Sequence, residues 1–365
     1  MFLIWEYMGS RIILIVKDGF DMKYKKIYMV ASYQYQSGGT ESSHQLVGWL
    51  NDRGNDAYIY YYDLKETKDI PIKYQRYSIK ISTKIEDKDC NLMIVPETLT
   101  NILYQYKTIQ KGIWWLSLNY YLYQIPNIHS ELVREKYELP VWSEKCIKVL
   151  FRKSNEKIFE FGEEKNAFLH FYNCEYVKMY LEKNGVSINN MFYLCGPIRD
   201  EYYERGAAVD INNKEDIILY NPNKGLHFTK KILKYANNIN TKYKFIPLIN
   251  MNSEKIVSIM EKSKLYIDFG DFPGPERIPR EAVMMYCNIL VAKIGSSYNM
   301  VDVPIPEKYK YYRKKRNISN IYSMIVELMD HYMEHIDEFE IYRSKVKSQR
   351  TDMKQTLDIV FGESS

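Results

Sequence analysis

Short apolar runs alternate along this chain with longer stretches in which apolar residues recur every three or four positions. The short runs have the length and the β-branched or aromatic composition of strands, and the longer stretches have the period of amphipathic helices. This alternation is typical of α/β layers with largely parallel sheets. Strands are expected at 27–32, 57–61, 92–95, 113–116, 167–171, 191–194, 217–220, 244–248, 265–269 and 289–292.

The first predicted helix, at 41–53, follows a glycine-containing loop. Leu46, Trp49 and Leu50 would share one face of this helix, and Gly54 stands where a C-terminal cap glycine is expected.

A helix at 228–236 follows a second such loop, at 221–225. Strand, glycine loop and helix thus recur at the head of each half, which is the outline of two Rossmann-like domains. The polar stretch 205–216 is expected to connect the halves, and 318–361 to be helical.

Composition is compatible with this division. The 365 residues suit about two domains of roughly 150 residues each. Lys and Arg number 51 against 46 Asp and Glu, and the net charge of +5 does not by itself indicate nucleic acid. The five cysteines are scattered and form no C-x-x-C pair, so neither a disulfide framework nor a zinc site is expected, and a reducing cytoplasm is favoured.

The first segment is apolar but poorly suited to the membrane. Glu6 and Arg11 interrupt it, and no run in the chain approaches the roughly 18 apolar residues of a membrane span. It also lacks the basic leader of a signal peptide. Since Met22 reads like an ordinary protein start, residues 1–21 are expected to be an N-terminal extension, and a genuine structural segment is the alternative.

Two loops have the composition of phosphate-binding turns. Gly38 and Gly39 lie between a strand and a helix, where glycine permits close backbone approach and the helix start offers free N–H groups. The loop 221–225 has the same placement and adds Lys224, which could neutralise a phosphate. Ordinary turns with one solvated lysine remain the alternative.

The segment 264–284 carries the strongest signal. An apolar strand ends at Asp268, a Gly/Pro loop follows, and Pro279 suits the first position of the next helix. Arg277 and Arg280 would then lie beside the positive end of a helix, where a cation is unfavourable by roughly 0.3–1 kcal/mol. We interpret the pair as a site for a phosphate or diphosphate. Pairing with Glu276, Glu281 or Asp271 is the alternative.

With these loops in place, the chain resembles glycosyltransferases of the two-domain GT-B type, especially the family-4-like enzymes of bacterial capsule and polysaccharide clusters. The resemblance spans roughly 22–340 and rests on four motifs: Gly38-Gly39-Thr40-Glu41; Asn221-x-x-Lys224-Gly225, with asparagine where arginine is usual; Arg280-Glu281-Ala282 followed by Ile289-Leu290-Val291; and Gly295-Ser296-Ser297.

The resemblance implies an α/β fold of two Rossmann-like domains with a cleft between them. An acceptor domain would occupy 22–200 and a nucleotide-sugar domain 201–340. The C-terminal helices would cross back, with 341–365 packing on the N-terminal domain.

The resemblance also implies residue roles. Glu281 would hold the ribose of the donor, and the basic residues Lys224, Arg277 and Arg280 its diphosphate. The family's glycine loops would add to the nucleotide-sugar site through Gly38, Gly39, Asn221, Gly225 and Ser296.

This sequence departs from the family pattern at two places. The family pairs two glutamates eight positions apart, but Pro273 stands eight before Glu281, and Glu276 is the nearest acidic substitute. The family's N-domain histidine is not evident either, since Ser117 and Asn119 follow Trp114-Trp115.

The implied activity is transfer of a sugar from a UDP- or GDP-sugar to a glycan or lipid-linked acceptor in surface polysaccharide synthesis. An electropositive pocket would stabilise the leaving diphosphate, so neither a cofactor nor a metal is expected. If the reaction inverts the sugar, the candidates for the base are Glu41, His44, Asp268 and Glu276. The alternatives are a catalytically silent GT-B module that binds a nucleotide sugar or glycan, and a nucleotide-sugar epimerase.

The segment 308–316 interleaves basic and aromatic residues. It is a candidate for contact with an anionic membrane surface or with nucleic acid. The context favours the membrane, which would place the protein in the cytoplasm at its inner face, with no nucleic-acid partner. A solvated basic face is the alternative.

Overall fold

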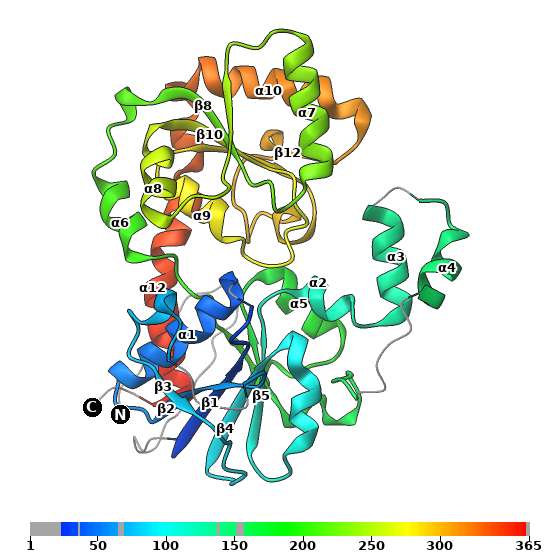
Figure 1. Cartoon of the computed structure of the whole chain (residues 1–365), viewed down its shortest axis with the longest axis vertical. Helices are drawn as coiled ribbons and strands as arrows, with labels where there is room; N and C mark the ends of the chain where they lie inside the picture. Colours follow the sequence, from blue (N-terminus) through cyan, green and yellow to red (C-terminus); the bar gives the residue numbers. More distant parts are fainter. Residues whose placement is uncertain (1–22, 36, 65–68, 137–138, 151–156, 363–365) are drawn as a thin grey trace.

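The computed structural model describes residues 23–35, 37–64, 69–136, 139–150 and 157–362. The expected N-terminal extension, 1–21, lies outside these ranges. Two parallel sheets, each flanked by helices, face each other end to end (Figure 1). The expected architecture of two Rossmann-like α/β domains is therefore confirmed.

The N-terminal domain is built on a sheet that has seven parallel strands in the described part of the chain, in the order β3-β2-β1-β4-β5-β6-β7. Strands β1 and β4 are buried almost throughout, as expected for a parallel sheet covered on both faces. The strand bounds are β1 Lys26–Ala31, β2 Ala57–Tyr61, β3 Lys80–Ser82, β4 Asn91–Pro96, β5 Gln110–Trp115, β6 Leu169–Tyr172 and β7 Met191–Tyr193.

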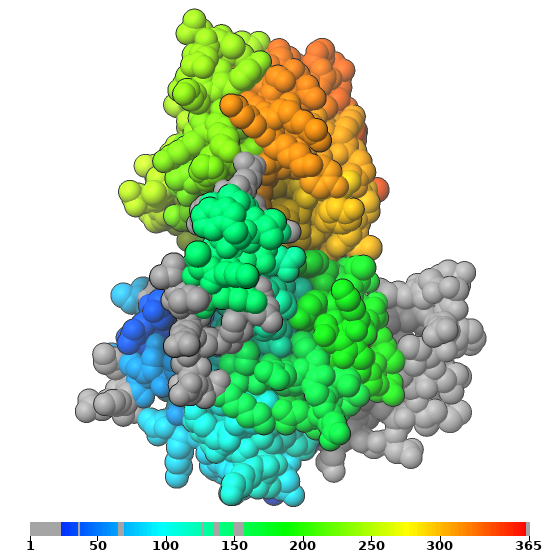
Figure 2. Space-filling model, turned by 90° about the vertical axis from the view of Figure 1, so that its right-hand side faces the viewer, coloured from blue at the N-terminus to red at the C-terminus, as the bar shows by residue number. Residues whose placement is uncertain are grey.

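Two separate apolar cores cover this sheet. Helix α1 and part of helix α12 (Glu340–Phe361) lie on one face, and α2 and α5 lie on the other. Helices α3 and α4 stand away from the rest of the domain (Figure 1), and Figure 2 shows that side of the molecule. The helix bounds are α1 Gly38–Asp52, α2 Leu118–Leu122, α3 Pro126–Lys136, α4 Ser143–Leu150 and α5 Glu175–Lys183.

The C-terminal domain has one core around a sheet with five parallel strands among the described residues, in the order β12-β11-β10-β8-β9. The strand bounds are β8 Glu215–Tyr220, β9 Lys244–Pro247, β10 Ser263–Asp268, β11 Asn288–Ala292 and β12 Lys310–Tyr311. The helix bounds are α6 Asp200–Ala207, α7 Leu226–Asn238, α8 Ser253–Lys262, α9 Arg277–Met284, α10 Ile318–Asp330, α11 Tyr332–His335 and α12 Glu340–Phe361.

Two helix starts differ from expectation. Helix α1 begins at Gly38, three residues early, because the Ser37 hydroxyl accepts the N–H of Thr40 and caps it. The glycine pair therefore forms the first turn of a helix and not a loop. Helix α9 begins at Arg277, so the expected placement of Pro279 at its first position is wrong.

Helix α12 joins the two domains, as expected. Tyr342 and Val346, near its start, lie in the C-terminal core, whereas Met353, Leu357 and Phe361 lie in the N-terminal core. The helix crosses from one domain to the other in Figure 1. Within the described ranges, no helix is both long and apolar enough to cross a membrane.

A second link between the domains is a helix cap supplied across the interface. The N-cap residue of α5, Cys174, makes no side-chain capping bond. Instead, the buried carboxylate of Asp302, from the C-terminal domain, accepts the N–H groups of Glu175 at 2.7 Å and Tyr176 at 2.8 Å. A negative charge at a helix start also interacts favourably with the helix dipole.

We expect Asp302→Asn to lower the free energy of unfolding by about 1–2 kcal/mol, because the amide removes the charge and one of the two acceptor oxygens. Asp200→Asn is the control, since Asp200 is an exposed carboxylate paired with Arg350 and such a pair contributes about 0–1 kcal/mol. Urea unfolding measures both, and equal losses would contradict the interdomain cap.

Candidate active site

A cavity of about 770 Å³ lies between the carboxyl ends of the two sheets. This volume is within the range of small-molecule and cofactor sites, roughly 300–1,000 Å³. The carboxyl edge of a parallel sheet is where α/β proteins bind ligands, and here two such edges share one space.

The glycine turn of α1 forms part of the wall. A Cβ atom at Gly38 would lie 3.6 Å from Cδ of Arg277 in the opposite domain. A Cβ atom at Gly39 would lie 3.4 Å from Cδ1 of Leu116 on the N-terminal side. Gly38 therefore faces the C-terminal domain, and Gly39 faces the end of β5.

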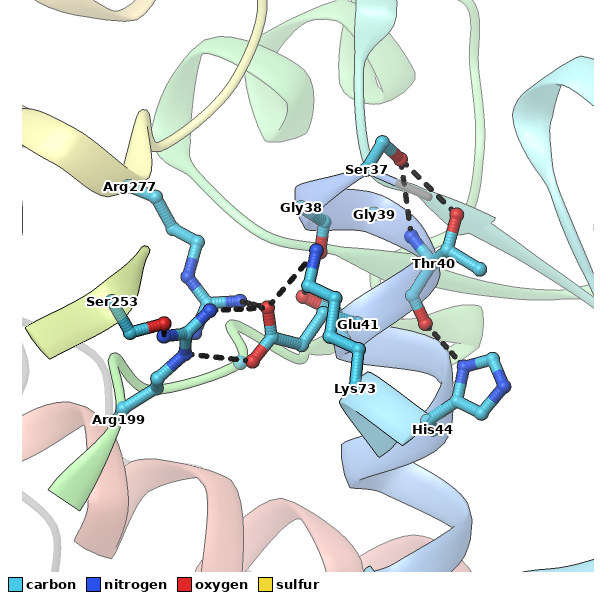
Figure 3. A network of polar contacts seen from close by, with 12 residues as sticks. Ser37, Gly38, Gly39, Thr40, Glu41, His44, Lys73, Arg199, Ser253 and Arg277 are labelled. Atoms are coloured by element: carbon cyan, nitrogen blue, oxygen red, sulfur yellow. Dashed lines mark hydrogen bonds and ion pairs between the residues drawn. The ribbon is translucent and has the colours of Figure 1, made fainter. Parts of the chain in front are cut away.

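Glu41, in the first turn of α1, is the centre of an ion cluster that crosses the cavity (Figure 3). Its Oε1 lies 3.0 Å from Nε of Arg199, and its Oε2 lies 3.2 Å from Nη1 of Arg277 and 3.9 Å from Nζ of Lys73. Burial alone would raise the pKa of Glu41, but Arg277, Arg199 and Lys73 lower it to about 2. Glu41 is therefore ionised at neutral pH.

Lys73 and Arg199 are site residues that the sequence patterns did not reveal. Lys73 belongs to a 3-10 turn, Ile72–Tyr74, and Arg199 is the N-cap residue of α6. Arg199 is 158 positions from Glu41, so nothing local connects them. A second guanidinium nitrogen of Arg277, Nη2, is buried with no hydrogen-bond partner among the described residues.

The loop after β8 contributes less charge than expected. Asn221 and Lys224 line the cavity, but the ammonium group of Lys224 makes an ion pair with Glu276, which also lines it. Gly225 does not line the cavity: it has a φ of 63°, and a Cβ atom there would lie 2.1 Å from the carbonyl oxygen of Phe269. Gly225 thus permits close packing of two loops.

Two other predicted site residues lie behind the cavity wall. Asp268 is buried and accepts the hydroxyl of Tyr266 at 2.7 Å and the N–H of Gly270 at 2.8 Å. Burial, followed by the charge of Glu276, raises the pKa of Asp268 to about 6. Ser296 is also buried and donates to the carbonyl of Gly274 at 2.7 Å. Neither lines the cavity, so the structure does not bring them to the site.

The two arginines of α9 have different surroundings. Arg277 lies in the cavity and is 3.5 Å from Glu281, which also lines it. Arg280 is buried, and its guanidinium donates to the carbonyl of Gly196 at 2.9 Å and to Oε1 of Gln349 at 2.7 Å. It also donates to two carbonyls of the Gly/Pro loop. Arg280 therefore also lines the cavity, but its side chain is almost fully enclosed and its guanidinium is bonded within the protein.

His44 is also a packing residue. It is buried, with Nδ1 2.6 Å from the carbonyl of Thr40 and Nε2 2.7 Å from the hydroxyl of Tyr61. Burial lowers its pKa to about 4. Since both ring nitrogens are occupied, this side chain is poorly placed to act as a base.

Much of the basic segment 308–316 is engaged within the protein. Lys308 lies 2.9 Å from Glu338, and Arg313 lies 2.7 Å from Asp271. The ammonium of the buried Lys310 donates to the carbonyl of Asn299. In the described part of the chain, no group of three or more His, Cys, Asp or Glu side chains is placed to hold a metal ion.

Comparisons with known proteins show which solved structures share the fold of this chain. A scan of known protein families and a search of curated protein sequences find no match. Among solved structures, a glycosyltransferase from Rickettsia africae is similar over 93% of this chain and 99% of its own, with a TM-score of 0.57 and 12% identity.

HepE of Anabaena, solved with UDP and glucose, matches over 92% of this chain and 99% of its own, with a TM-score of 0.57 and 9% identity. Sucrose-phosphate synthase of Thermosynechococcus elongatus matches over 92% and 98%, with a TM-score of 0.52 and 10% identity. The chain thus has the two-domain GT-B fold that its motifs implied.

We expect Arg280→Ala to lower the free energy of unfolding by about 3 kcal/mol, because it leaves several buried acceptors without a donor. Arg280→Lys should recover little of this loss of stability, since a compact ammonium group cannot reach the several acceptors that the planar guanidinium group reaches. Arg316→Ala, at an exposed position, is the control. Urea unfolding is the measurement, and unchanged stability of Arg280→Ala would contradict a structural role.

Proposed function

We propose that this protein is a glycosyltransferase that moves a sugar from a nucleoside-diphosphate sugar to an acceptor. The observation that carries the proposal is the ion cluster in the cavity between the domains. Three cations that line the cavity, Lys73, Arg199 and Arg277, lie within 4 Å of Glu41, as does Arg76 outside the lining. Glu281, 3.5 Å from Arg277, adds a second carboxylate to this cluster. This surplus of positive charge is suited to a diphosphate.

The cluster has a direct use in sugar transfer. As the bond between the sugar and the diphosphate breaks, negative charge grows on the leaving group. Fixed cations already in place, in a site largely shielded from water, stabilise that charge without reorganising. Arg277, with one buried nitrogen unpartnered among the described residues, is the best placed donor, and Arg199 and Lys73 lie against the same carboxylate of Glu41.

Of the predicted catalytic carboxylates, Glu41 fits an electrostatic role. A group with a pKa of about 2 is a weak base at neutral pH. We infer that Glu41 holds Arg199 and Arg277 in place between reaction cycles and that an incoming diphosphate shares them. Glu276, paired with Lys224, would position that lysine beside the donor.

The donor, acceptor and location are finer parts of the proposal. HepE was solved with UDP-glucose, which makes UDP-sugars the first donors to test. Resemblance to capsule-cluster enzymes supports a glycan or lipid-linked acceptor, surface polysaccharide synthesis and a cytoplasmic location. Lys314, Lys315 and Arg316 are exposed, which supports contact of 308–316 with the inner face of a membrane.

Replacing Arg277 or Arg199 by alanine should weaken UDP binding by about 10- to 100-fold, since a charge-assisted hydrogen bond contributes about 1.5–3 kcal/mol. Arg205→Ala is the matched control, because Arg205 lies at the other end of α6 and pairs with Glu254 and Glu261. Isothermal titration calorimetry is the measurement. If both variants bind UDP within twofold of the parent protein, the donor site lies elsewhere.

Transfer should proceed in EDTA at its full rate, because Lys and Arg side chains supply the positive charge that a divalent ion would otherwise bring to the diphosphate. The check is UDP release from a UDP-sugar with EDTA and with added Mn²⁺. Activity that is lost in EDTA and restored by Mn²⁺ would contradict a metal-independent mechanism.

A further inference from the structure

Three polar side chains line the N-terminal wall of the cavity outside the ion cluster. Glu97 directly follows β4, Ser117 comes two residues after β5, and Asn173 directly follows β6. Their exposed fractions are 2%, 8% and 5%, so all three are more than nine-tenths buried. Adjacent parallel strands bring them to one edge of the sheet.

Glu97 is a buried carboxyl group without an ion pair among the described residues. Its Oε2 accepts the N–H of Leu116 at 2.8 Å. Burial raises its pKa to about 8, although backbone N–H groups lower it in part. The carboxyl group is therefore mostly protonated and uncharged at neutral pH. Its O–H is a hydrogen-bond donor, and the neighbouring backbone N–H groups cannot accept it because they are donors themselves.

Among the described residues, the elements packed against Glu97 bring no fixed charge to its carboxyl group. Strand β4 ends in Pro96 and β5 in Trp115, and the titratable side chain of α2 that lines the cavity is Tyr120. Gln124, two residues after the end of α2, donates to the backbone carbonyls of Glu97 and Tyr120. The surroundings thus keep the carboxyl group uncharged.

The other two side chains have unused hydrogen-bonding atoms. The hydroxyl of Ser117 and Oδ1 of Asn173 are buried without a partner in the part of the chain that the structure describes. Nδ2 of Asn173 donates to the carbonyl of Leu116 at 2.9 Å, which fixes the amide. Buried polar groups are nearly always hydrogen-bonded, so unpartnered ones in a cavity wall point to a ligand.

We propose that Glu97, Ser117 and Asn173 form an uncharged subsite that hydrogen-bonds the hydroxyl groups of a neutral carbohydrate acceptor. This inference rests on the proposed function and names the acceptor class. Tyr35, Tyr62 and Tyr120 line the same cavity and are exposed. Their rings can pack on the C–H faces of a sugar while their hydroxyl groups reach its polar edge.

The subsite lies across the glycine turn from the cations. Gly38 faces Arg277, whereas Gly39 faces Leu116, whose N–H is bonded to Glu97. A diphosphate on the Arg277 side and an acceptor hydroxyl on the Glu97 side would therefore meet at the sugar between them. The subsite consists only of N-terminal residues, which favours the acceptor over the donor as its ligand.

Ser117→Ala gives a clean first test, because the removed hydroxyl has no partner in the free protein. Its unfolding midpoint should be unchanged or higher, and its UDP affinity unchanged. Binding of p-nitrophenyl β-glucoside and β-galactoside to the UDP-bound protein, followed by NMR, should weaken by about 2- to 10-fold. p-Nitrophenyl β-glucuronide, which carries a charge, should bind more weakly than either to the parent protein.

Glu97 is tested through pH. Glycoside affinity of the parent protein should fall as pH rises through about 8, since ionised Glu97 loses its O–H donor. Glu97→Gln keeps an uncharged donor, so its affinity should stay close to that of the parent at neutral pH and become independent of pH. Glu97→Ala should bind the glycosides about tenfold or more weakly than the parent protein. Glu86→Gln, at the amino end of the sheet beside Lys26, is the control.

Several results would overturn the subsite: a pH-independent affinity in the parent protein, a Glu97→Gln variant as weak as Glu97→Ala, or Ser117→Ala binding glycosides as tightly as the parent. Failure of every neutral glycoside to bind while UDP binds would also overturn it. So would Ser117 and Glu97 variants that lose affinity for the UDP-sugar but not for the glycosides. These outcomes leave UDP binding intact, whereas failure of the proposed function appears first as a parent protein that does not bind UDP.

Discussion

The salt bridges from Glu41 to Arg199 and Arg277 are the contact on which the arrangement of the site depends. A buried carboxylate is costly unless it is paired, and here its partners come from the starts of α6 and α9. The spacing of the two sheets is therefore linked to the charge balance of the cavity.

The two buried glutamates of the cavity illustrate how environment sets chemistry. Glu41 is surrounded by cations and has a pKa of about 2, whereas the partners of Glu97 among the described residues are backbone N–H groups and its pKa is about 8. The same side chain is thus permanently charged on one side of the glycine turn and mostly neutral on the other. Divergent pKa values of this kind separate an electrostatic role from a hydrogen-bonding one.

Most of the fold could be predicted because buried parallel strands are continuous apolar runs. The exceptions, β3 and β12, are edge strands of two or three residues that include Lys80 and Lys310, so no periodic signal marks them. Local motifs pointed to Glu41 and Arg277, and both line the cavity. They could not find Arg199, which approaches Glu41 only after the chain has folded.

The different surroundings of Arg277 and Arg280 show where a local pattern reaches its limit. Both flank the same helix start, and Arg280 is buried because Gln349 of α12 and the carbonyl of Gly196 pack against it in the folded chain. One feature of the sequence indicates that Glu97 could belong to a site, because its carboxyl group comes directly after a buried strand. The strand and helix pattern could not indicate that it lacks a cation.

The path of α12 also bears on the order in which the protein is made. Met353, Leu357, Val360 and Phe361 complete one face of the N-terminal core, yet they are synthesised after the entire C-terminal sheet. During translation the face of the N-terminal domain that these residues cover therefore remains exposed, although most residues of that domain are synthesised much earlier. Such a surface is a natural place for a chaperone to bind, and the finished helix removes it.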